Sequence, residues 1–460
     1  MVRRFASFAL VGLVACGSTP KTKSTPDEVV DPDGPHRVAV ETQIAPFVDH
    51  EIVTGIVIGL YDAGKHEIYG FGKGPGGKEP SGATLFEIGS VTKVYTSLLL
   101  ADAVQRREVA LDSTVAELMP TGVTVPTAEK TPITLKHLAL HSSGLPRLPP
   151  SIAGNPSPDP YGQYTEDLLY RDLIVTRLES PPGSQIVYSN FGAGLLGFAL
   201  GRKIGGGFTK ALETRVLAPL GLTDTFVTVP ATAEARLATG SDADLQPAKR
   251  WTFQDTLAGA GALISSARDQ LKLIEAELDA ASGGKGPLRA PMRLSQEPQL
   301  ANIGANQGLG WQIDSQGRYW HNGGTAGFRS FIAFDLKSRR GIVILSATST
   351  TLVDLLGGTL FEILEGAQKP APVLPAPDRL AAYVGSYDFA GQKLTVVADG
   401  KKLFIEAPNE PRRRMMPMGD DKFWLESIQS VCRFQSDDNK VARLVFSIGG
   451  RDVVATRSVN

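Results

Sequence analysis

Cysteine is scarce in this chain, and neither sign of charge dominates it. The 460 residues include two cysteines, Cys16 and Cys432, and 47 basic side chains against 48 acidic ones. Cys16 lies in an N-terminal segment that resembles a processing site, so Cys432 has no second cysteine to pair with inside the folded domains. We therefore expect no internal disulfide, and stability must come from the hydrophobic core. The near balance of charge gives no reason to expect a nucleic-acid partner. The oligomeric state cannot be read from the sequence.

Several motifs of common enzyme classes are also absent. No Gly-x-Ser-x-Gly sequence occurs, which argues against an α/β-hydrolase, whose nucleophilic serine sits in that turn. Neither a Walker A pattern nor a dinucleotide-binding glycine pattern stands between a strand-like and a helix-like segment. We therefore expect a protein that works without a cofactor.

Long apolar runs are missing, apart from a short one near the N-terminus. Phe5–Val14 follows two arginines and precedes small residues, and it is too short to span a bilayer, so residues 1–15 are expected to form a cleaved signal peptide. Leu13-Val14-Ala15-Cys16 resembles a bacterial lipobox, in which Cys16 becomes lipidated and anchors the protein to a membrane. The alternative is a chance cysteine at the end of an apolar run.

The segment after Cys16 predicts a tether and a location. Residues 16–35 are rich in Ser, Thr, Pro, Lys and Asp, a composition typical of a flexible, disordered linker. Gly17 replaces the aspartate associated with retention in the inner membrane. We therefore expect a lipid-anchored protein of the cell envelope, attached to the outer membrane and facing the periplasm.

Three short motifs occur in one order: Ser90-Val91-Thr92-Lys93, Tyr188-Ser189-Asn190 and His321-Asn322-Gly323. A short buried run precedes the first motif, Gly89 breaks it, and apolar residues then recur at helical spacing. The pattern predicts that Ser90 opens a helix. Because residues three apart share one face of a helix, we expect the Lys93 ammonium to lie beside the Ser90 hydroxyl.

This arrangement suits catalysis by a nucleophilic serine. A serine hydroxyl at its free pKa is a poor nucleophile, so acyl transfer needs a base within hydrogen-bond reach and donors for the developing oxyanion. The helix N-terminus adds positive potential and free N–H groups. Taken singly, the residues have plainer interpretations: Ser90 as a helix cap, Tyr188 as a core residue, Asn190 as a turn residue and His321 as a strand histidine.

The order of the three motifs resembles the class C β-lactamases and the related penicillin-binding carboxypeptidases, a group that also includes esterases. The resemblance extends from about Gly55 to Leu364. Its supporting stretches are Ile133–Pro146, Pro182-Gly183, Leu217–Phe226, Gly259–Asp269 and Gly308–Trp311.

The resemblance implies a role for each residue of the first two motifs. Ser90 would be the acylated nucleophile, and Lys93 and Tyr188 would share its proton, with the choice of base left open. Asn190 would hydrogen-bond the substrate amide and steady Lys93. The sequence lacks the Glu-x-x-Leu-Asn element that class A β-lactamases use for deacylation, so Tyr188 and Lys93 would have to activate the water.

The third motif departs from the family pattern, which is usually Lys-Thr-Gly or His-Thr-Gly. By the resemblance, the backbone N–H groups of Ser90 and Gly324 would form the oxyanion hole, with Asn322 and Gly323 beside the substrate. A histidine is largely neutral near pH 7, so His321 would offer a substrate carboxylate a weaker charge than lysine does. This histidine resembles the carboxypeptidase branch more than the efficient β-lactamases.

Two further features have competing interpretations. His137 and His141 are four apart on an expected helix, a spacing that metal ligands use, but they lack a third ligand pattern and fall in a stretch that resembles a metal-free family. We therefore expect no metal site. Arg329 could reach a substrate carboxylate, although a surface salt bridge is an equally good interpretation.

The chain divides at a proline-rich linker. Residues 368–378 are expected to be stiff and extended. Before them, residues 36–367 have strand-like ends around a helical middle, as in the β-lactamase/transpeptidase fold of the α/β (α+β) class, with an antiparallel sheet flanked by helices and a helical lobe. After them, residues 379–460 predict a small all-β, barrel-like domain, with hairpin turns at Asp399-Gly400 and Gly449-Gly450. Its start resembles the lipocalin-like tails of other serine hydrolases in this family.

The sequence thus predicts a serine hydrolase with an acyl-enzyme on Ser90, acting on D-Ala-D-Ala-type peptidoglycan peptides or on β-lactams. Two alternatives stay open. One is an esterase of the same family, and the other is a sensor that penicillin or muropeptides acylate without turnover.

Overall fold

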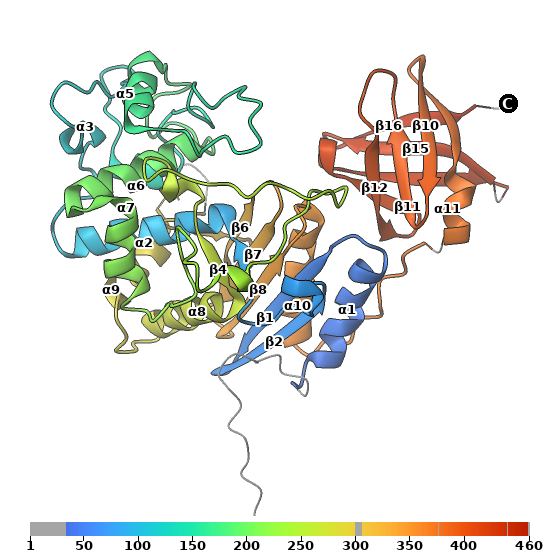
Figure 1. The fold of residues 1–460 in the computed structure, drawn as a ribbon, viewed down its shortest axis with the longest axis horizontal. Helices are drawn as coiled ribbons and strands as arrows, with labels where there is room; N and C mark the ends of the chain where they lie inside the picture. Colours follow the sequence, from blue (N-terminus) through green and yellow to red (C-terminus); the bar gives the residue numbers. More distant parts are fainter. Residues whose placement is uncertain (1–33, 300–305, 376, 439, 459–460) are drawn as a thin grey trace, which may run out of the picture.

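The central sheet of the first domain is built from two segments far apart in the sequence. The computed structural model describes residues 34–299, 306–375, 377–438 and 440–458, and within them six antiparallel strands follow the order β2-β1-β8-β7-β6-β5. The early hairpin joins the late strands where β1 pairs with β8, for example Ile58 with Ile344. This confirms the predicted sheet from both chain ends (Figure 1). The strands are β1 (Gly55–Asp62), β2 (Lys65–Gly72), β5 (Gln312–Ile313), β6 (Tyr319–Gly324), β7 (Arg329–Asp335) and β8 (Arg340–Ser346).

Both faces of this sheet are covered. Side chains alternate between faces along a strand, so Ile56, Ile58 and Leu60 pack against α1 (Arg37–Asp49) and α10 (Leu356–Leu364). Val57 and Tyr61 belong to the larger core on the opposite face, which α8 (Ala267–Ala281) covers. A sheet buried on both faces is a rigid base for the site described below.

A helical lobe stands beside the sheet, at the left of Figure 1. At its centre lies α2 (Thr92–Gln105), which is buried on nearly every side, as expected for a helix that is apolar all round. The other helices are α3 (Val115–Leu118), α4 (Leu135–Ala139), α5 (Glu166–Val175), α6 (Asn190–Ile204), α7 (Gly207–Leu212) and α9 (Arg289–Gln296). A short two-stranded sheet, β3 (Leu85–Glu87) with β4 (Ile264–Ser266), leads into the 3₁₀ turn η2 (Gly89–Val91).

The C-terminal domain is a closed antiparallel barrel, which confirms the predicted all-β module. Within the described residues, eight strands close in the order β10-β11-β12-β13-β14-β15-β16-β9, preceded by α11 (Pro377–Tyr383). The strands are β9 (Gly385–Phe389), β10 (Gln392–Asp399), β11 (Lys402–Glu406), β12 (Arg413–Gly419), β13 (Lys422–Leu425), β14 (Ser430–Asp437), β15 (Lys440–Ile448) and β16 (Arg451–Arg457).

Both predicted hairpins are present in the barrel, and one turn differs by a residue. Ile448 pairs with Arg451 around Gly449 and Gly450, whose positive φ angles of 57° and 77° suit a two-residue turn. In the other hairpin Asp399 itself pairs with Lys402. The turn residues there are Gly400 and Lys401 rather than Asp399 and Gly400, because Asp399 takes the last position of its strand.

The barrel packs on the first domain through buried polar contacts. Arg414, 4% exposed, donates to backbone carbonyls of Glu51 (2.6 Å), His50 (3.3 Å) and Ala243 (3.2 Å). In the 3₁₀ turn η8 (Glu426–Ile428), the Glu426 carboxylate accepts bonds from Thr350 Oγ1 and from the backbone N–H of Thr351, both at 3.0 Å. The two domains therefore share a defined interface.

The predicted signal peptide, Cys16 and nearly all of the predicted tether lie outside the described residues. Among the helices that the structure does describe, none has the length and apolar character needed to cross a bilayer. Within the predicted linker, residues 368–375 form neither helix nor strand. Helix α11 begins at Pro377, two residues before the predicted first residue of the barrel domain.

Candidate active site

Ser90 lies in η2, directly before α2, as its sequence context predicts. One turn later, Lys93 Nζ donates to Ser90 Oγ over 3.0 Å and to the carbonyl oxygen of Ala260 over 2.6 Å. The Ala260 carbonyl belongs to η5 (Ala258–Ala260), which packs on α2. The predicted Ser90–Lys93 contact is therefore present, and a second bond fixes the direction of the amine.

The environment of Lys93 favours its neutral form. The side chain is 3% exposed, and burial holds its pKa well below the usual range of lysine, with the charge of Arg147 acting in the same direction. A buried ammonium without a carboxylate partner loses its proton readily. A neutral amine 3.0 Å from Ser90 Oγ can accept the hydroxyl proton.

The ring of Tyr188 packs against Lys93, Arg147 and His141 in the same site. Its ring centroid lies 4.9 Å from Lys93 Nζ, 5.2 Å from the Arg147 guanidinium carbon and 4.3 Å from the His141 ring centroid. Burial raises the pKa of Tyr188 to about 12, although the Ser90 hydroxyl and Arg147 oppose this shift. Tyr188 is therefore a protonated phenol at neutral pH, which suits a proton donor rather than a base.

The two histidines at the spacing of metal ligands, His137 and His141, have other partners. Helix α4 ends at Ala139, and His141 has a positive φ of 56°, so the pair does not lie four apart on one helix as the sequence led us to expect. His137 Nδ1 accepts from the Thr134 N–H, and His141 Nδ1 accepts from the Ser189 N–H, each over 3.2 Å. In the portion of the chain that the structure covers, no cluster of three or more His, Cys, Asp or Glu side chains could hold a metal ion.

His321 faces the interior behind Lys93. It is 3% exposed, its Nδ1 lies 2.7 Å from the Asn322 carbonyl oxygen, and it lines a small internal cavity together with Lys93 and His141. Burial lowers the pKa of His321 to about 3, and Lys93 in its charged form acts in the same direction. The imidazole is therefore neutral at physiological pH. As a donor through Nδ1, it leaves Nε2 as an acceptor.

Asn322 faces the opposite side of β6, as strand alternation requires. Its Nδ2 donates to Asp354 Oδ2 over 2.7 Å, and Asp354 also accepts from Arg329, whose Nε lies 2.8 Å from Oδ1. Asp354 belongs to the 3₁₀ turn η7 (Thr351–Leu355). The side chains of Arg329 and Asp354 are only 16% and 19% exposed. Arg329 thus forms a largely buried ion pair, not the surface salt bridge that the sequence suggested.

Glycines let β6 approach the nucleophile. A Cβ on Gly323 would lie 2.0 Å from the Ile88 carbonyl oxygen and 2.8 Å from the backbone nitrogen of Ser90. A Cβ on Gly89 would lie 2.8 Å from the backbone nitrogen of Gly324. The two N–H groups expected to form the oxyanion hole therefore belong to backbones in van der Waals contact, an approach that only glycine permits.

Asn190 begins α6, with Ser189 as its N-cap. Its Nδ2 donates to the Tyr161 hydroxyl over 3.2 Å, while its buried Oδ1 has no hydrogen-bond partner among the described residues. The bonds of Lys93 go to Ser90 and Ala260, so the expected direct contact between Asn190 and Lys93 is not formed here. An unpartnered buried acceptor is available for a substrate N–H.

Sequence reasoning missed several residues of this site. They are the Ala260 carbonyl, Arg147 beside Tyr188, His141 against the Tyr188 ring, Tyr161 beside Asn190, and Asp354 beneath Asn322. Glu87 was missed too: it is buried next to η2, and burial raises its pKa to about 7. Apart from the helical spacing of His141 from His137, no periodicity or spacing marks these residues, because tertiary packing brings them to the site.

The chain is similar to known proteins in both sequence and structure. Residues 40–364 match the Beta-lactamase family. The D-alanyl-D-alanine-carboxypeptidase/endopeptidase AmpH of Escherichia coli (strain K12) is 30% identical over 226 residues, which cover 48% of this chain and 57% of that protein. A Beta-lactamase of the same organism is 26% identical over 286 residues, covering 60% of this chain and 70% of that one.

A solved structure has the same fold. The beta-lactamase/D-alanine carboxypeptidase from Yersinia pestis, complexed with citrate, aligns with a TM-score of 0.62 and 25% identity, covering 71% of this chain and 98% of its own. The chain belongs to the Beta-lactamase family, because the family match covers well over half of its residues. Its first domain has the β-lactamase/transpeptidase-like fold. The alignment with AmpH spans little more than half of that protein's length.

Proposed function

We propose that the protein is a serine hydrolase that forms an acyl-enzyme on Ser90 and acts on D-Ala-D-Ala-type peptides or on β-lactams. The observation that carries the proposal is the buried Lys93 amine, 3.0 Å from Ser90 Oγ. Membership of a family of hydrolases supports it. The names of the AmpH and Beta-lactamase relatives support the substrate class.

The mechanism follows from the protonation states. Neutral Lys93 accepts the Ser90 proton as Oγ forms a bond to the substrate carbonyl carbon. The carbonyl π electrons move to oxygen, and the N–H groups of Ser90 and Gly324 stabilise the resulting oxyanion. When the oxyanion collapses, the C–N bond breaks, and the leaving nitrogen takes a proton from Tyr188, which Lys93 reprotonates.

Deacylation reverses these roles. Water approaches the ester carbonyl, and the neutral pair of Lys93 and Tyr188 accepts its proton as the new C–O bond forms. The second tetrahedral intermediate collapses by breaking the bond to Ser90 Oγ, which recovers its proton from Lys93. The net reaction adds one water across the scissile bond.

An esterase is the second candidate, and one observation favours it. Recognition of a substrate carboxylate calls for a cation in the site. At the third motif His321 is neutral because its pKa lies near 3, and Arg329 is already paired with Asp354, so this role would fall to Arg147 beside Tyr188. An ester substrate needs the same nucleophile and oxyanion hole but no carboxylate recognition.

We also propose that the protein is anchored to the outer membrane through lipid on Cys16 and faces the periplasm, where peptidoglycan peptides occur. The lipid anchor rests on the sequence of residues 13–16, and the outer-membrane location rests on Gly17. Mass spectrometry of the mature N-terminus from cells would test it. Two acyl chains or three on Cys16 would support an anchor, and an unmodified Cys16 in the mature protein would contradict it.

The experiment for the hydrolase measures acylation and turnover together. A soluble form, residues 17–460, is incubated with a penicillin, a peptide ending in D-Ala-D-Ala and p-nitrophenyl butyrate in separate reactions, with Ser90→Ala as control. A lasting mass increase with penicillin that disappears in Ser90→Ala supports a peptidase or a sensor that is acylated without turnover, and release of D-alanine distinguishes the peptidase. Loss of β-lactam absorbance without a lasting adduct supports a β-lactamase. Activity on the ester alone supports the esterase, and activity that survives in Ser90→Ala refutes the mechanism.

A further inference from the structure

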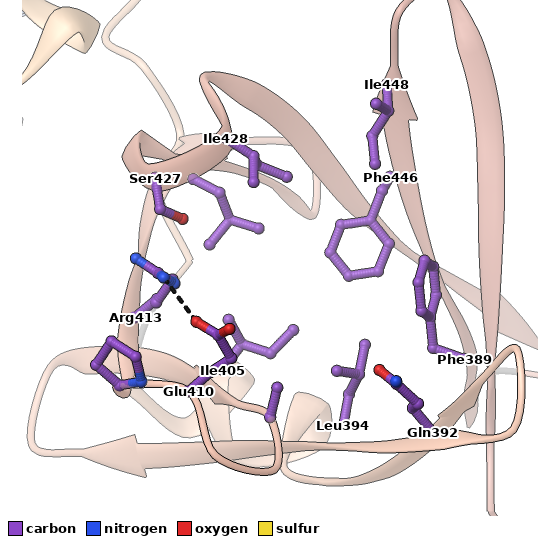
Figure 2. Close-up of a pocket in the computed structure, with 13 residues that line it drawn as sticks. Phe389, Gln392, Leu394, Ile405, Glu410, Arg413, Ser427, Ile428, Phe446 and Ile448 are labelled. Atoms are coloured by element: carbon purple, nitrogen blue, oxygen red, sulfur yellow. Dashed lines mark hydrogen bonds and ion pairs between the residues drawn. The ribbon is translucent and has the colours of Figure 1, made fainter.

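The C-terminal barrel contains a pocket at one end, away from Ser90. The cavity measures about 380 Å³, within the range of small-molecule sites. Figure 2 shows side chains from opposite walls of the barrel around a common open space. Its walls include Leu394 of β10, Ile405 of β11, Leu425 of β13 and Phe446 of β15.

The interior of this pocket is apolar. Leu394, Ile405, Leu425 and Phe446 are each at most 8% exposed, and the Phe389 and Phe446 rings meet edge to face with centroids 5.5 Å apart. An apolar cavity in a preformed barrel gains free energy when an apolar group fills it, because that group leaves water and finds contact atoms.

Apolar side chains also line two sides of the pocket opening. Ile428 and Ile448 line the cavity, yet they are 47% and 45% exposed. Single exposed aliphatic side chains are ordinary, but these two lie at one opening and come from different segments, η8 and β15. They lengthen the apolar surface from the cavity outward.

Polar groups are confined to the rim. Among the described residues that line the cavity, the only charged ones are Arg413 and Glu410, whose Nη2 and Oε2 lie 3.0 Å apart. Both are substantially exposed, with side chains 41% and 57% accessible. Arg413 has further N–H donors that suit a carboxylate or another anionic group.

We propose that the barrel pocket binds the alkyl chain of an anionic amphiphile, with its head group at Arg413 and its tail against Leu394 and Phe446. The shared chemistry is an unbranched apolar tail on a single anionic head, as in a fatty acid or in the acyl chain of a lipid. This site is independent of the hydrolytic function proposed for Ser90.

The test is displacement of the fluorescent probe N-phenyl-1-naphthylamine from the soluble form, residues 17–460, by straight-chain carboxylates of six to fourteen carbons. Because each buried methylene contributes about 0.8 kcal/mol, affinity is expected to rise about fourfold per carbon until the pocket is full. Equal displacement by all chain lengths, or no displacement at all, would overturn the proposal.

Matched variants locate the binding. Ala407→Trp fills the half-buried mouth and is expected to weaken the longest carboxylate at least tenfold, whereas Val454→Trp adds the same ring to an exposed barrel position outside the pocket and leaves affinity unchanged. Should Ala407→Trp fail to fold, the exposed Ile428→Asp gives a second measurement, with an expected loss of several-fold. Unchanged affinity in a folded Ala407→Trp would overturn the proposal.

Two further comparisons define the head group and the source of the tail. Arg413→Gln is expected to weaken carboxylates several-fold while leaving the matching alkyl alcohols unaffected, and equal effects on both would refute the anionic head. Sedimentation with phosphatidylglycerol vesicles separates the two sources. Binding that Ala407→Trp abolishes indicates the acyl chain of a membrane lipid, and absence of vesicle binding beside carboxylate displacement indicates a free amphiphile.

Discussion

Asn322 Nδ2 donates to Asp354 Oδ2 over 2.7 Å, and this bond ties the strand of the third motif to a turn on the far side of the sheet. Asn322 immediately precedes Gly323, which lies against the backbone of Ser90, and Gly324, which lies against Gly89. Because Asp354 also holds Arg329, on the neighbouring strand at the register position opposite Gly324, one carboxylate positions both sides of the hairpin that would supply the oxyanion donor.

We therefore expect Asp354→Ala to lower kcat/KM about 10- to 100-fold, since small misplacements of a catalytic group have effects of this size. The measurement is hydrolysis of the best substrate found for the protein. Asp62→Ala is the control, because Asp62 forms a comparable ion pair with Arg340 (2.9 Å) on other strands of the same sheet. Equal activity losses in the two variants would mean a general effect on stability rather than positioning of β6.

Gly323→Ala is expected to impair the site directly. The new Cβ would overlap the Ile88 carbonyl, so β6 must move away from Ser90, with a loss of about 1–3 kcal/mol in unfolding free energy and a fall in kcat/KM of about 100-fold or more. Gly358→Ala is the matched control: its Cβ meets no heavy atom within 4 Å on α10. That change should stabilise the protein by about 0.5–1 kcal/mol with activity intact. Normal activity in Gly323→Ala would contradict the close approach.

The pH dependence of acylation distinguishes the two candidate bases. If neutral Lys93 is the base, kcat/KM rises with pH through its lowered pKa and reaches a plateau well below pH 10. If Tyr188 phenolate is the base, activity keeps rising toward pH 12, because burial raises that pKa to about 12. We expect the first profile. Lys93→Met should lower kcat/KM about 10²- to 10⁴-fold, while Lys210→Met, at an exposed position, should have no effect.

A buried carboxyl predicts how stability changes with pH. Glu277 has no exposed surface, its Oε2 accepts from Gln296 Nε2 over 2.5 Å, and burial raises its pKa from 4.5 to about 8. Between these values the folded state holds a proton that the unfolded state has released, so stability falls as pH rises from about 4.5 to 8. Glu277→Gln should remove this decline and be more stable than the wild type at pH 8, by up to a few kcal/mol.

Urea unfolding at pH 5 and at pH 8 measures this difference. Glu297→Gln is the control, because Glu297 is exposed near the same helices, and it should follow the wild type at both pH values. A Glu277→Gln variant that loses as much stability as the wild type between the two pH values would show that another group is responsible.

The part of the site that is local in sequence could be predicted, and the part made by tertiary packing could not. Ser90 and Lys93 are three residues apart on one helical turn, so their contact follows from helix geometry alone. The barrel hairpins follow equally from turn residues and alternation. In contrast, the Ala260 carbonyl is 167 residues from Lys93, and a carbonyl carries no side-chain signal.

The fate of Arg329 illustrates the same limit. Its charge and position suggested either substrate binding or a surface salt bridge, and the sequence holds no sign of Asp354, 25 residues away. Likewise His141 has a helical spacing from His137, but Ala139 ends the helix and His141 turns against Tyr188. The roles of Arg329 and His141 depend on contacts with residues distant in the sequence, and a single sequence does not specify those contacts.

The Arg414 contacts have a consequence for how the protein melts. A barrel side chain, 4% exposed, bonds carbonyls from two separate loops of the first domain, and burial lowers its pKa. Separating the domains would leave these carbonyls without their hydrogen-bond donor. It would also expose the apolar surface around Met416, a barrel residue that packs into a hydrophobic core of the first domain. The two domains therefore constitute one cooperative unit, which should denature in a single calorimetric transition and stay associated after cleavage between residues 368 and 375.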